Sequence, residues 1–247
     1  MKLNKIEPKF ISKANPRIGL ITLGSDFRIE KDFNNIIYGR DIDLYVNRIH
    51  CYNPLTNETL AKMAEDITDV TKDILPDQKL DCVAYGCTSG TVAAGYNVIK
   101  EKINLAKPEA KVTTPITSAI KALKLLGINK ISIFTPYTKT INDSVGNYFE
   151  KENIIINSLT YFDIDSDLDI GKVDEGYLFE VLSKIDLEDS DALFVSCTAL
   201  PVLSIINKLE KKLNKVVLSS NQTLIWDSLN AIDYKEKIDG FGKLFNS

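Results

Sequence analysis

The chain carries one short motif twice, as Asp81-Cys-Val-Ala-Tyr-Gly-Cys87-Thr88-Ser89 and as Asp191-Ala-Leu-Phe-Val-Ser-Cys197-Thr198-Ala199. In each copy an Asp precedes a short apolar run, and a Cys-Thr pair begins six positions after the Asp. Such a run is typical of a buried strand, and residues just beyond it lie at the edge where open α/β sheets bind ligands. The motif therefore predicts two thiols at equivalent points of two equivalent units.

The sequence around the two motifs has the same order of elements in both halves. Arg17 lies 70 positions before Cys87, and Lys130 lies 67 positions before Cys197. Predicted strands are 17–22, 43–49 and the run before Cys87 in the first half, and 130–134, 154–160 and the run before Cys197 in the second. Predicted helices are 27–38, 58–74, one running through Val98 and Ile103, 119–126, 141–151 and 174–185. Equal length and order indicate an internal duplication, and alternating strands and helices predict parallel sheets with right-handed crossovers.

These patterns predict an α/β protein with two pseudosymmetric Rossmann-like (flavodoxin-like) lobes and an active site between them. A further strand is predicted at 215–218, and a helix at 223–230. We expect residues 1–113 and 219–247 to form the N-terminal lobe, which carries Cys87. Residues 114–218 would form the C-terminal lobe, which carries Cys197.

Composition narrows the functional classes. A net charge of −4 argues against nucleic acid as a partner, because phosphate binding requires clustered Lys and Arg. No apolar run approaches 18 residues and the N-terminus has no signal-peptide pattern, so we expect a cytoplasmic protein without membrane segments. The single histidine, His50, excludes a multi-histidine metal cage, and Cys51 and Cys82 are interpreted as structural thiols.

Cys87 and Cys197 are better functional candidates than most cysteines, which are small buried hydrophobes. Each ends its strand and is followed by Thr and small residues. A helix beginning near Ser89 or Ala199 would direct its N-terminal N–H groups at the thiol and favour the thiolate.

Short polar side chains follow the other predicted strands as well. Individually they are best interpreted as helix N-caps, but together they indicate a site for a small anion. These residues are Ser25-Asp26, Tyr137-Thr138 and Ser220-Asn221-Gln222.

Six motifs resemble the aspartate/glutamate racemase superfamily, in the branch of maleate cis-trans isomerases, arylmalonate decarboxylase and ectoine-utilisation protein A. They are Arg17–Ile21, Tyr85–Gly90, Thr113–Ile116, Thr135–Thr138, Ser196–Thr198 and Ser220–Gln222. The resemblance spans about residues 17–232. Asp26 with Asp32-Phe33, Asn53–Thr56 and Tyr85–Val92 are most similar to ectoine-utilisation protein A.

The resemblance implies a cofactor-independent, metal-free site in which Cys87 and Cys197 face one another. It also implies that Tyr137 and loop amides bind a substrate carboxylate, and a homo-oligomer is expected. The implied substrate-binding residues are Asp26, Thr88, Ser89, Tyr137, Thr138, Asp167, Thr198 and Asn221.

The chain departs from the maleate isomerases, which carry Asn at the positions of Asp26 and Asp167. An amide can donate a hydrogen bond to a carboxylate, whereas an ionised Asp only accepts and repels a second carboxylate. The departure therefore favours a carboxylate substrate that also bears an ammonium or amidinium group, such as an amino acid or an ectoine derivative.

The favoured function is an isomerase of the racemase or epimerase type, in which one thiolate removes an α-proton and the other thiol returns a proton on the opposite face. Maleate cis-trans isomerisation by covalent addition of Cys87, with Cys197 supplying a proton, remains an alternative. So do decarboxylation of a disubstituted malonate and a non-catalytic binding protein.

Overall fold

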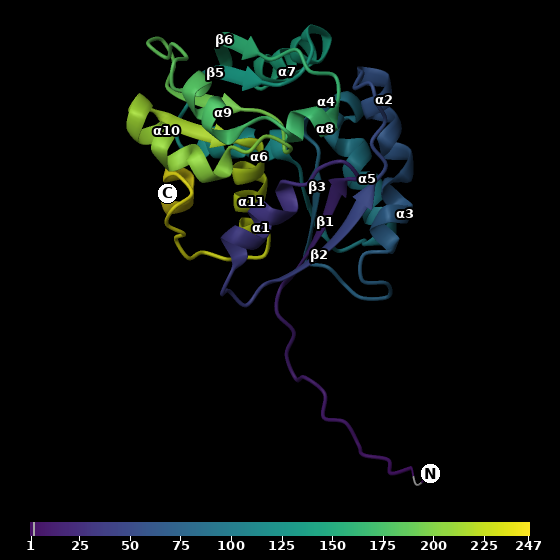
Figure 1. Cartoon of the computed structure of the whole chain (residues 1–247). Coiled ribbons are helices and arrows are strands. Elements are labelled where there is room, and N and C mark those ends of the chain that lie inside the picture. Colours follow the sequence, from purple (N-terminus) through teal and green to yellow (C-terminus); the bar gives the residue numbers. More distant parts are fainter. Residues whose placement is uncertain (2) are drawn as a thin grey trace.

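Two parallel four-stranded sheets form the centre of the molecule. The structure, a computed structural model, describes residue 1 and residues 3–247. The strand orders are β2-β1-β3-β4 and β6-β5-β7-β8, so the second sheet repeats the order of the first, as Figure 1 shows in part. The strands are β1 (Arg17–Leu23), β2 (Asp43–Ile49), β3 (Cys82–Gly86), β4 (Lys111–Thr113), β5 (Lys130–Thr135), β6 (Ile155–Tyr161), β7 (Ala192–Val195) and β8 (Val216–Ser219). The predicted α/β fold with two parallel sheets is confirmed.

Helices connect the strands within each sheet, except that α6 leads from the first sheet to the second and α11 follows the last strand. In the first half they are α1 (Ile29–Ile37), α2 (Asn57–Lys62), α3 (Ile67–Lys72), α4 (Thr88–Ala94), α5 (Tyr96–Ala106) and α6 (Pro115–Leu125). In the second half they are α7 (Lys139–Lys151), α8 (Asp167–Gly171), α9 (Glu175–Leu182), α10 (Ile206–Leu213) and α11 (Ser220–Ala231). The strands β3 and β7 are buried along their whole length, as their apolar sequences predict.

Several predicted helices have different bounds in the structure. The helix predicted over 58–74 is divided into α2 and α3 by a 3₁₀ turn at Met63–Asp66. The helix predicted after Cys87 is interrupted at Gly95, whose φ of 87° suits glycine best. The final helix begins at Ser220, three residues before the predicted start, because Ser219 accepts a hydrogen bond from the N–H of Gln222 as its N-cap.

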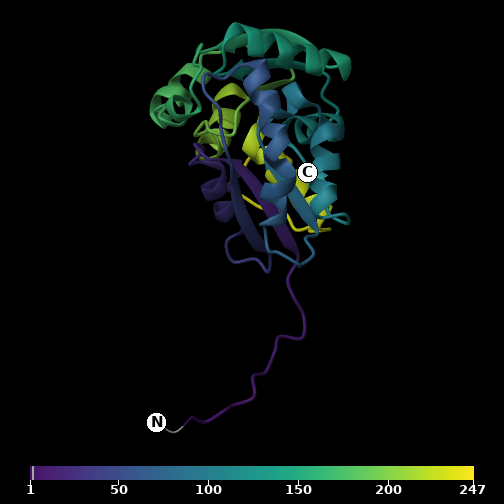
Figure 2. The same ribbon diagram turned by 90° about the vertical axis from the view of Figure 1, so that its right-hand side faces the viewer.

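Helix α11 links the two halves of the chain. It follows β8 of the second sheet, yet it packs against β3, β4, α6 and α1 of the first half. The division into lobes at 113/114 and 218/219 stays a prediction. Residues 3–16 extend away from the body of the molecule (Figures 1 and 2). Within the part of the chain that the structure describes, no helix is long and apolar enough to cross a membrane.

The contact between α6 and α11 includes a nearly buried carboxylate. Asp227 accepts hydrogen bonds from the hydroxyl of Ser118 at 2.9 Å and from the ammonium group of Lys121 at 2.7 Å. We expect Lys121→Met to lower the free energy of unfolding by about 1–2 kcal/mol, because it leaves a mostly buried charge with one hydroxyl donor. The control Lys124→Met removes only an exposed pair with Glu152 and should cost less than about 0.5 kcal/mol in the same urea titration. Equal losses in the two variants would contradict this assignment.

Candidate active site

Cys87 lies at the junction of β3 and α4, as its motif predicts. It is the N-cap of α4, and its Sγ accepts a hydrogen bond from the N–H of Gly90 at 3.2 Å. A Cβ atom at position 90 would lie 2.8 Å from that sulfur and 3.0 Å from the hydroxyl of Tyr85. Only glycine therefore allows the first turn of α4 to approach the thiol this closely.

Cys197 lies two residues beyond β7 in a different local structure. Its φ is 97°, a conformation that a residue with a side chain adopts only when its surroundings enforce it. The helix predicted from Ala199 is wrong: residues 198–202 are irregular, and α10 begins at Ile206 after a 3₁₀ turn. Leu200, Pro201 and Val202 are buried, so these apolar side chains fill the core as an irregular segment.

Hydrogen bonds join the two cysteine loops directly. The hydroxyl of Ser220 accepts from the hydroxyl of Thr88 at 2.8 Å and from the N–H of Cys197 at 3.0 Å. The hydroxyl of Thr198 donates to the carbonyl of Gly86 at 3.3 Å. The residues adjoining both thiols therefore meet around the N-terminus of α11.

Tyr137 lies near both thiols. Its side chain is buried, and burial raises its pKa well above the usual value. Negative charge on Cys197 and on Cys87 would raise that pKa further, which places both sulfurs within electrostatic range of the phenol. Ser89 is also close, with its hydroxyl 3.9 Å from the sulfur of Cys87. Thr138 is the half-buried N-cap residue of α7, and its hydroxyl does not cap that helix.

Three carboxyl groups lie in this region, of which Asp26 and Asp167 are buried and Asp32 is half-buried. Asp26 accepts from the N–H groups of Arg28 and Ile29 through Oδ1, whereas its buried Oδ2 has no partner. Burial raises the pKa of Asp26, that of Asp167 to about 6, and that of Asp32 to about 7. Negative charge on Asp26 raises the pKa of the other two further. The region is therefore strongly acidic and disfavours a second negative charge.

The thiols are protonated in this environment. Burial raises the pKa of Cys87 and of Cys197 above that of a free thiol, and Asp167 raises both further. Hydrogen bonds from Gly90 to Cys87, and from Ala199 and Tyr137 to Cys197, lower the pKa values but do not offset burial. Burial therefore opposes the predicted preference for thiolate.

One residue near the site, Cys51, was not assigned to it from the sequence, whereas Ser25 was among the polar residues expected there. Cys51, interpreted as structural, follows β2, and Ser25 lies within hydrogen-bonding reach of its thiol. Negative charge on Cys51 would raise the pKa of Cys87, so it lies within electrostatic range of that thiol. Ser25 also donates to Asp167 at 2.5 Å, across the two halves of the chain. A lone cysteine after β2 gives no sequence signal for this convergence.

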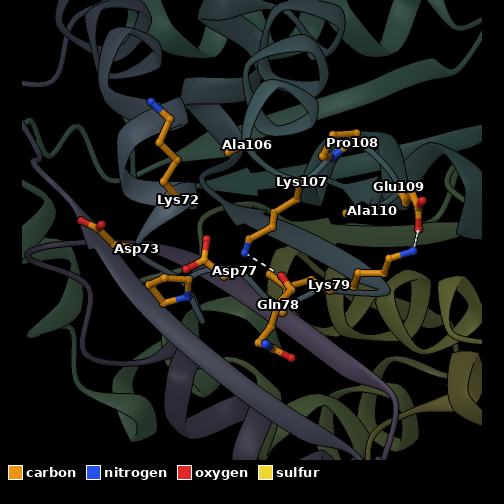
Figure 3. A pocket seen from close by; sticks show the side chains of 12 residues that line it. Lys72, Asp73, Asp77, Gln78, Lys79, Ala106, Lys107, Pro108, Glu109 and Ala110 are labelled. Carbon is orange, nitrogen blue, oxygen red and sulfur yellow. Dashed lines mark hydrogen bonds and ion pairs between the residues drawn. The ribbon is translucent and has the colours of Figure 1, made fainter.

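The thiols lie below the molecular surface, with exposed fractions of 3% for Cys87 and 5% for Cys197. A surface cavity of about 500 Å³ is lined by residues 72–73, 76–80 and 106–110, away from the thiols (Figure 3). Lys107, which lines this cavity, donates hydrogen bonds to the carbonyls of Leu75 and Gln78. These bonds link the end of α5 to the segment that precedes β3. Among the described residues no cluster of three or more His, Cys, Asp or Glu suits a metal ion.

The raised pKa of Asp167 gives a prediction for stability. A carboxyl with a higher pKa in the folded than in the unfolded state stabilises the fold below about pH 4, and this contribution is lost as pH rises through about 6. We therefore expect Asp167→Asn to increase the free energy of unfolding at pH 8 by about 1–3 kcal/mol, and by much less at pH 4. Urea unfolding at the two pH values measures the difference.

Asp169 is the matched control, because it lies in the same helix but is exposed and paired with Lys172, which lowers its pKa. Asp169→Asn should give no gain at pH 8. A gain in both variants, or in neither, would argue against burial as the cause.

The comparisons with known proteins agree with this geometry. A maleate isomerase of Geobacillus stearothermophilus is 26% identical over 93% of this chain and 97% of its own length. The arylmalonate decarboxylase of Bordetella bronchiseptica is 25% identical over 54% of this chain and 57% of its own length. A Nocardia farcinica maleate cis-trans isomerase structure superposes with a TM-score of 0.86 at 19% identity, covering 94% of this chain and 98% of that one.

The family model described as arylmalonate decarboxylase matches residues 51–245. These matches confirm the expectation of an enzyme and the resemblance at the level of the branch, whereas the closer likeness to ectoine-utilisation protein A is not shown. The chain belongs to the arylmalonate decarboxylase family, and it is similar in sequence and in fold to maleate isomerases.

Proposed function

We propose that this enzyme is a cofactor-independent isomerase of a small carboxylate, with Cys87 and Cys197 as its acid and base. The observation that carries the proposal is the convergence of two buried thiols on Tyr137, with their loops joined through Ser220. Two proton-transfer groups on opposite faces of one carbon are the minimum requirement for inverting it without a cofactor.

In the proposed reaction one cysteine, as thiolate, takes the proton α to the carboxylate. The C–H electron pair moves into the carboxylate to give an enediolate, and the other cysteine, as thiol, donates a proton to the opposite face. Tyr137 and the N–H groups of the loops would stabilise the developing negative charge, which is most effective in a site that excludes water. The reverse reaction uses the same groups with their protonation states exchanged.

The acidic surroundings support a substrate with a positive group. Asp26 presents an unpartnered carboxylate oxygen, and Asp167 lies within electrostatic range of both thiols. An ammonium or amidinium near the reacting carbon would be attracted by these carboxylates. The same positive charge would lower the pKa of the thiols and assist formation of the thiolate. An amino acid or an ectoine-derived carboxylate meets both conditions. The homo-oligomeric state and the cytoplasmic location remain predictions.

Cis-trans isomerisation by covalent addition of a cysteine is the second candidate, and the relatives favour it. The Nocardia farcinica structure is described as a cysteine-to-serine mutant with a covalently bound succinylcysteine intermediate. Incubation with maleate followed by mass spectrometry of the intact protein distinguishes the two candidates, because only covalent addition leaves an adduct on a thiol. Decarboxylation would instead release CO₂ from a disubstituted malonate.

Solvent exchange tests the proposed proton transfer. In D₂O the enzyme should place deuterium at Cα of its substrate, detected by NMR across amino acids, diaminobutyrate derivatives, ectoines and maleate. Cys87→Ser and Cys197→Ser should each reduce racemisation by at least about a thousandfold, because each removes one proton-transfer group. The control Cys82→Ser alters a buried thiol that contacts Thr113 and should retain most activity. Wild-type rates in both single variants would exclude the two-thiol mechanism.

Asp26→Asn tests the positive group on the substrate. We expect it to raise KM for an ammonium-bearing substrate by about tenfold or more, because a hydrogen bond to a charged partner is weakened. A dicarboxylate such as maleate should bind the variant more tightly than the wild type, measured by competition. Unchanged preference between the two compounds would remove the reason for placing a cation beside Asp26.

A further inference from the structure

The side-chain amide of Asn221 is held in one orientation. Its Nδ2 donates to Oδ2 of Asp32 at 2.8 Å and to the backbone carbonyl of Thr198 at 2.8 Å. The backbone carbonyl of Thr198 can only accept a hydrogen bond, so it requires the amide nitrogen of Asn221 on its side. The carboxyl of Asp32, whose pKa is raised to about 7, accepts the second amide hydrogen in its ionised form.

This orientation leaves the amide oxygen of Asn221 without a donor. Asn221 is 2% exposed, and its Oδ1 is buried without a hydrogen-bond partner. A buried acceptor without a donor costs free energy, so native structures satisfy most of them with protein, water or ligand. Asn221 is the second residue of α11, and its amide nitrogen donates to the carbonyl of Thr198. The amide oxygen therefore lies beside the loop that carries Cys197.

A second buried acceptor without a partner lies on the loop between β1 and α1. Asp26 is 1% exposed, and its Oδ2 is also buried without a partner. The hydroxyl of Thr198 is close enough to lower the pKa of Asp26, but its single hydrogen is donated to the carbonyl of Gly86. Thr198, which directly follows Cys197, thus contacts the amide of Asn221 through its carbonyl and lies close to the carboxyl of Asp26 through its hydroxyl.

The neighbouring cations do not satisfy these oxygens. Arg48 donates to the carbonyls of Leu23 and Asp26 and to the carboxylate of Glu30. Arg28 donates to the carbonyl of Gly171. The described hydrogen bonds therefore leave the acceptor oxygens of Asn221 and Asp26 unpartnered, and the hydroxyl of Ser196, next to Cys197, is unpartnered as well.

We propose that Asn221 determines substrate specificity by presenting its Oδ1, together with Oδ2 of Asp26, to N–H donors of a cationic nitrogen on the substrate. Asp32 is a positioning residue that fixes the amide of Asn221 in the accepting orientation. The inference rests on the proposed function for the location of the substrate, and it adds the residue that selects an α-ammonium compound over its deaminated counterpart.

Binding to an inactive enzyme tests the inference separately from catalysis. The full chain with Cys87→Ser and Cys197→Ser is titrated calorimetrically with pairs that differ in the α-ammonium group alone. The pairs are aspartate and succinate, glutamate and glutarate, and 2,4-diaminobutyrate and 4-aminobutyrate, with both enantiomers of each amino acid. We expect at least one amino acid to bind more tightly than its counterpart by about tenfold or more.

Adding Asn221→Leu to the inactive enzyme should abolish that preference, because it removes one hydrogen bond to a charged group. The Kd of the amino acid should rise, whereas the Kd of its counterpart should change by no more than about threefold. Asp32→Asn should reduce the preference less, because the carbonyl of Thr198 still holds the amide. The control Asn104→Leu removes another amide that donates to backbone carbonyls, at the end of α5, and should leave the preference unchanged.

Three results would overturn the inference: no amino acid that binds more tightly than its counterpart, an unchanged preference in Asn221→Leu, or the same loss in Asn104→Leu. Thermal unfolding of each variant shows whether it folds. If Asn221→Leu does not fold, an unchanged preference in Asp32→Asn overturns the inference instead. If the inactive enzyme prefers an amino acid but the wild type exchanges no α-proton in D₂O, the proposed proton transfer is rejected and this binding site is retained. If the wild type exchanges the α-proton but the inactive enzyme shows no preference, this binding site is rejected and the proton transfer is retained.

Discussion

The hydroxyl of Ser220 is the contact on which the candidate site depends. It accepts from Thr88, which follows one thiol, and from the backbone N–H of Cys197, the other. Ser220 can do this because α11 leaves the second sheet after β8 and packs on β3 and β4 of the first. The chain thus crosses between its duplicated halves at the point where the carboxyl ends of the parallel strands approach one another.

Burial then sets the chemistry of the groups collected there. Thiols and carboxyls are each favoured in the protonated form when water is excluded, and here burial is the largest cause of the raised pKa of Cys87, Cys197, Asp26 and Asp167. A negatively charged intermediate in such a site needs compensation, and Arg48, whose charge lowers the pKa of Asp26, is committed to carbonyls and Glu30. A positive group carried by the substrate supplies that compensation at the moment it binds.

The sequence was sufficient for features that depend on local pattern. The repeated Asp-apolar-Cys-Thr motif located β3 and β7, and the equal spacing predicted two sheets of the same order. The three-residue strand β4 was missed because a run this short has no periodicity. Residues 198–202 have the apolar and small side chains of a helix start, yet tertiary packing holds them as an irregular segment. The pairing of Asp32 with Asn221 joins residues 189 positions apart, which a single sequence cannot show.

The duplicated thiols are not equivalent, and the difference arises in the backbone. Cys87 caps α4 and receives the N–H of Gly90, in extended geometry that costs nothing. Cys197 is held at a positive φ, which costs about 1–3 kcal/mol for a residue with a side chain and persists only where surrounding contacts enforce it. Those contacts include Ser220 on its own N–H and Thr198, whose hydroxyl and carbonyl are both engaged. The repeat therefore preserved the position of the second thiol while an irregular segment replaces the helix that supports the first.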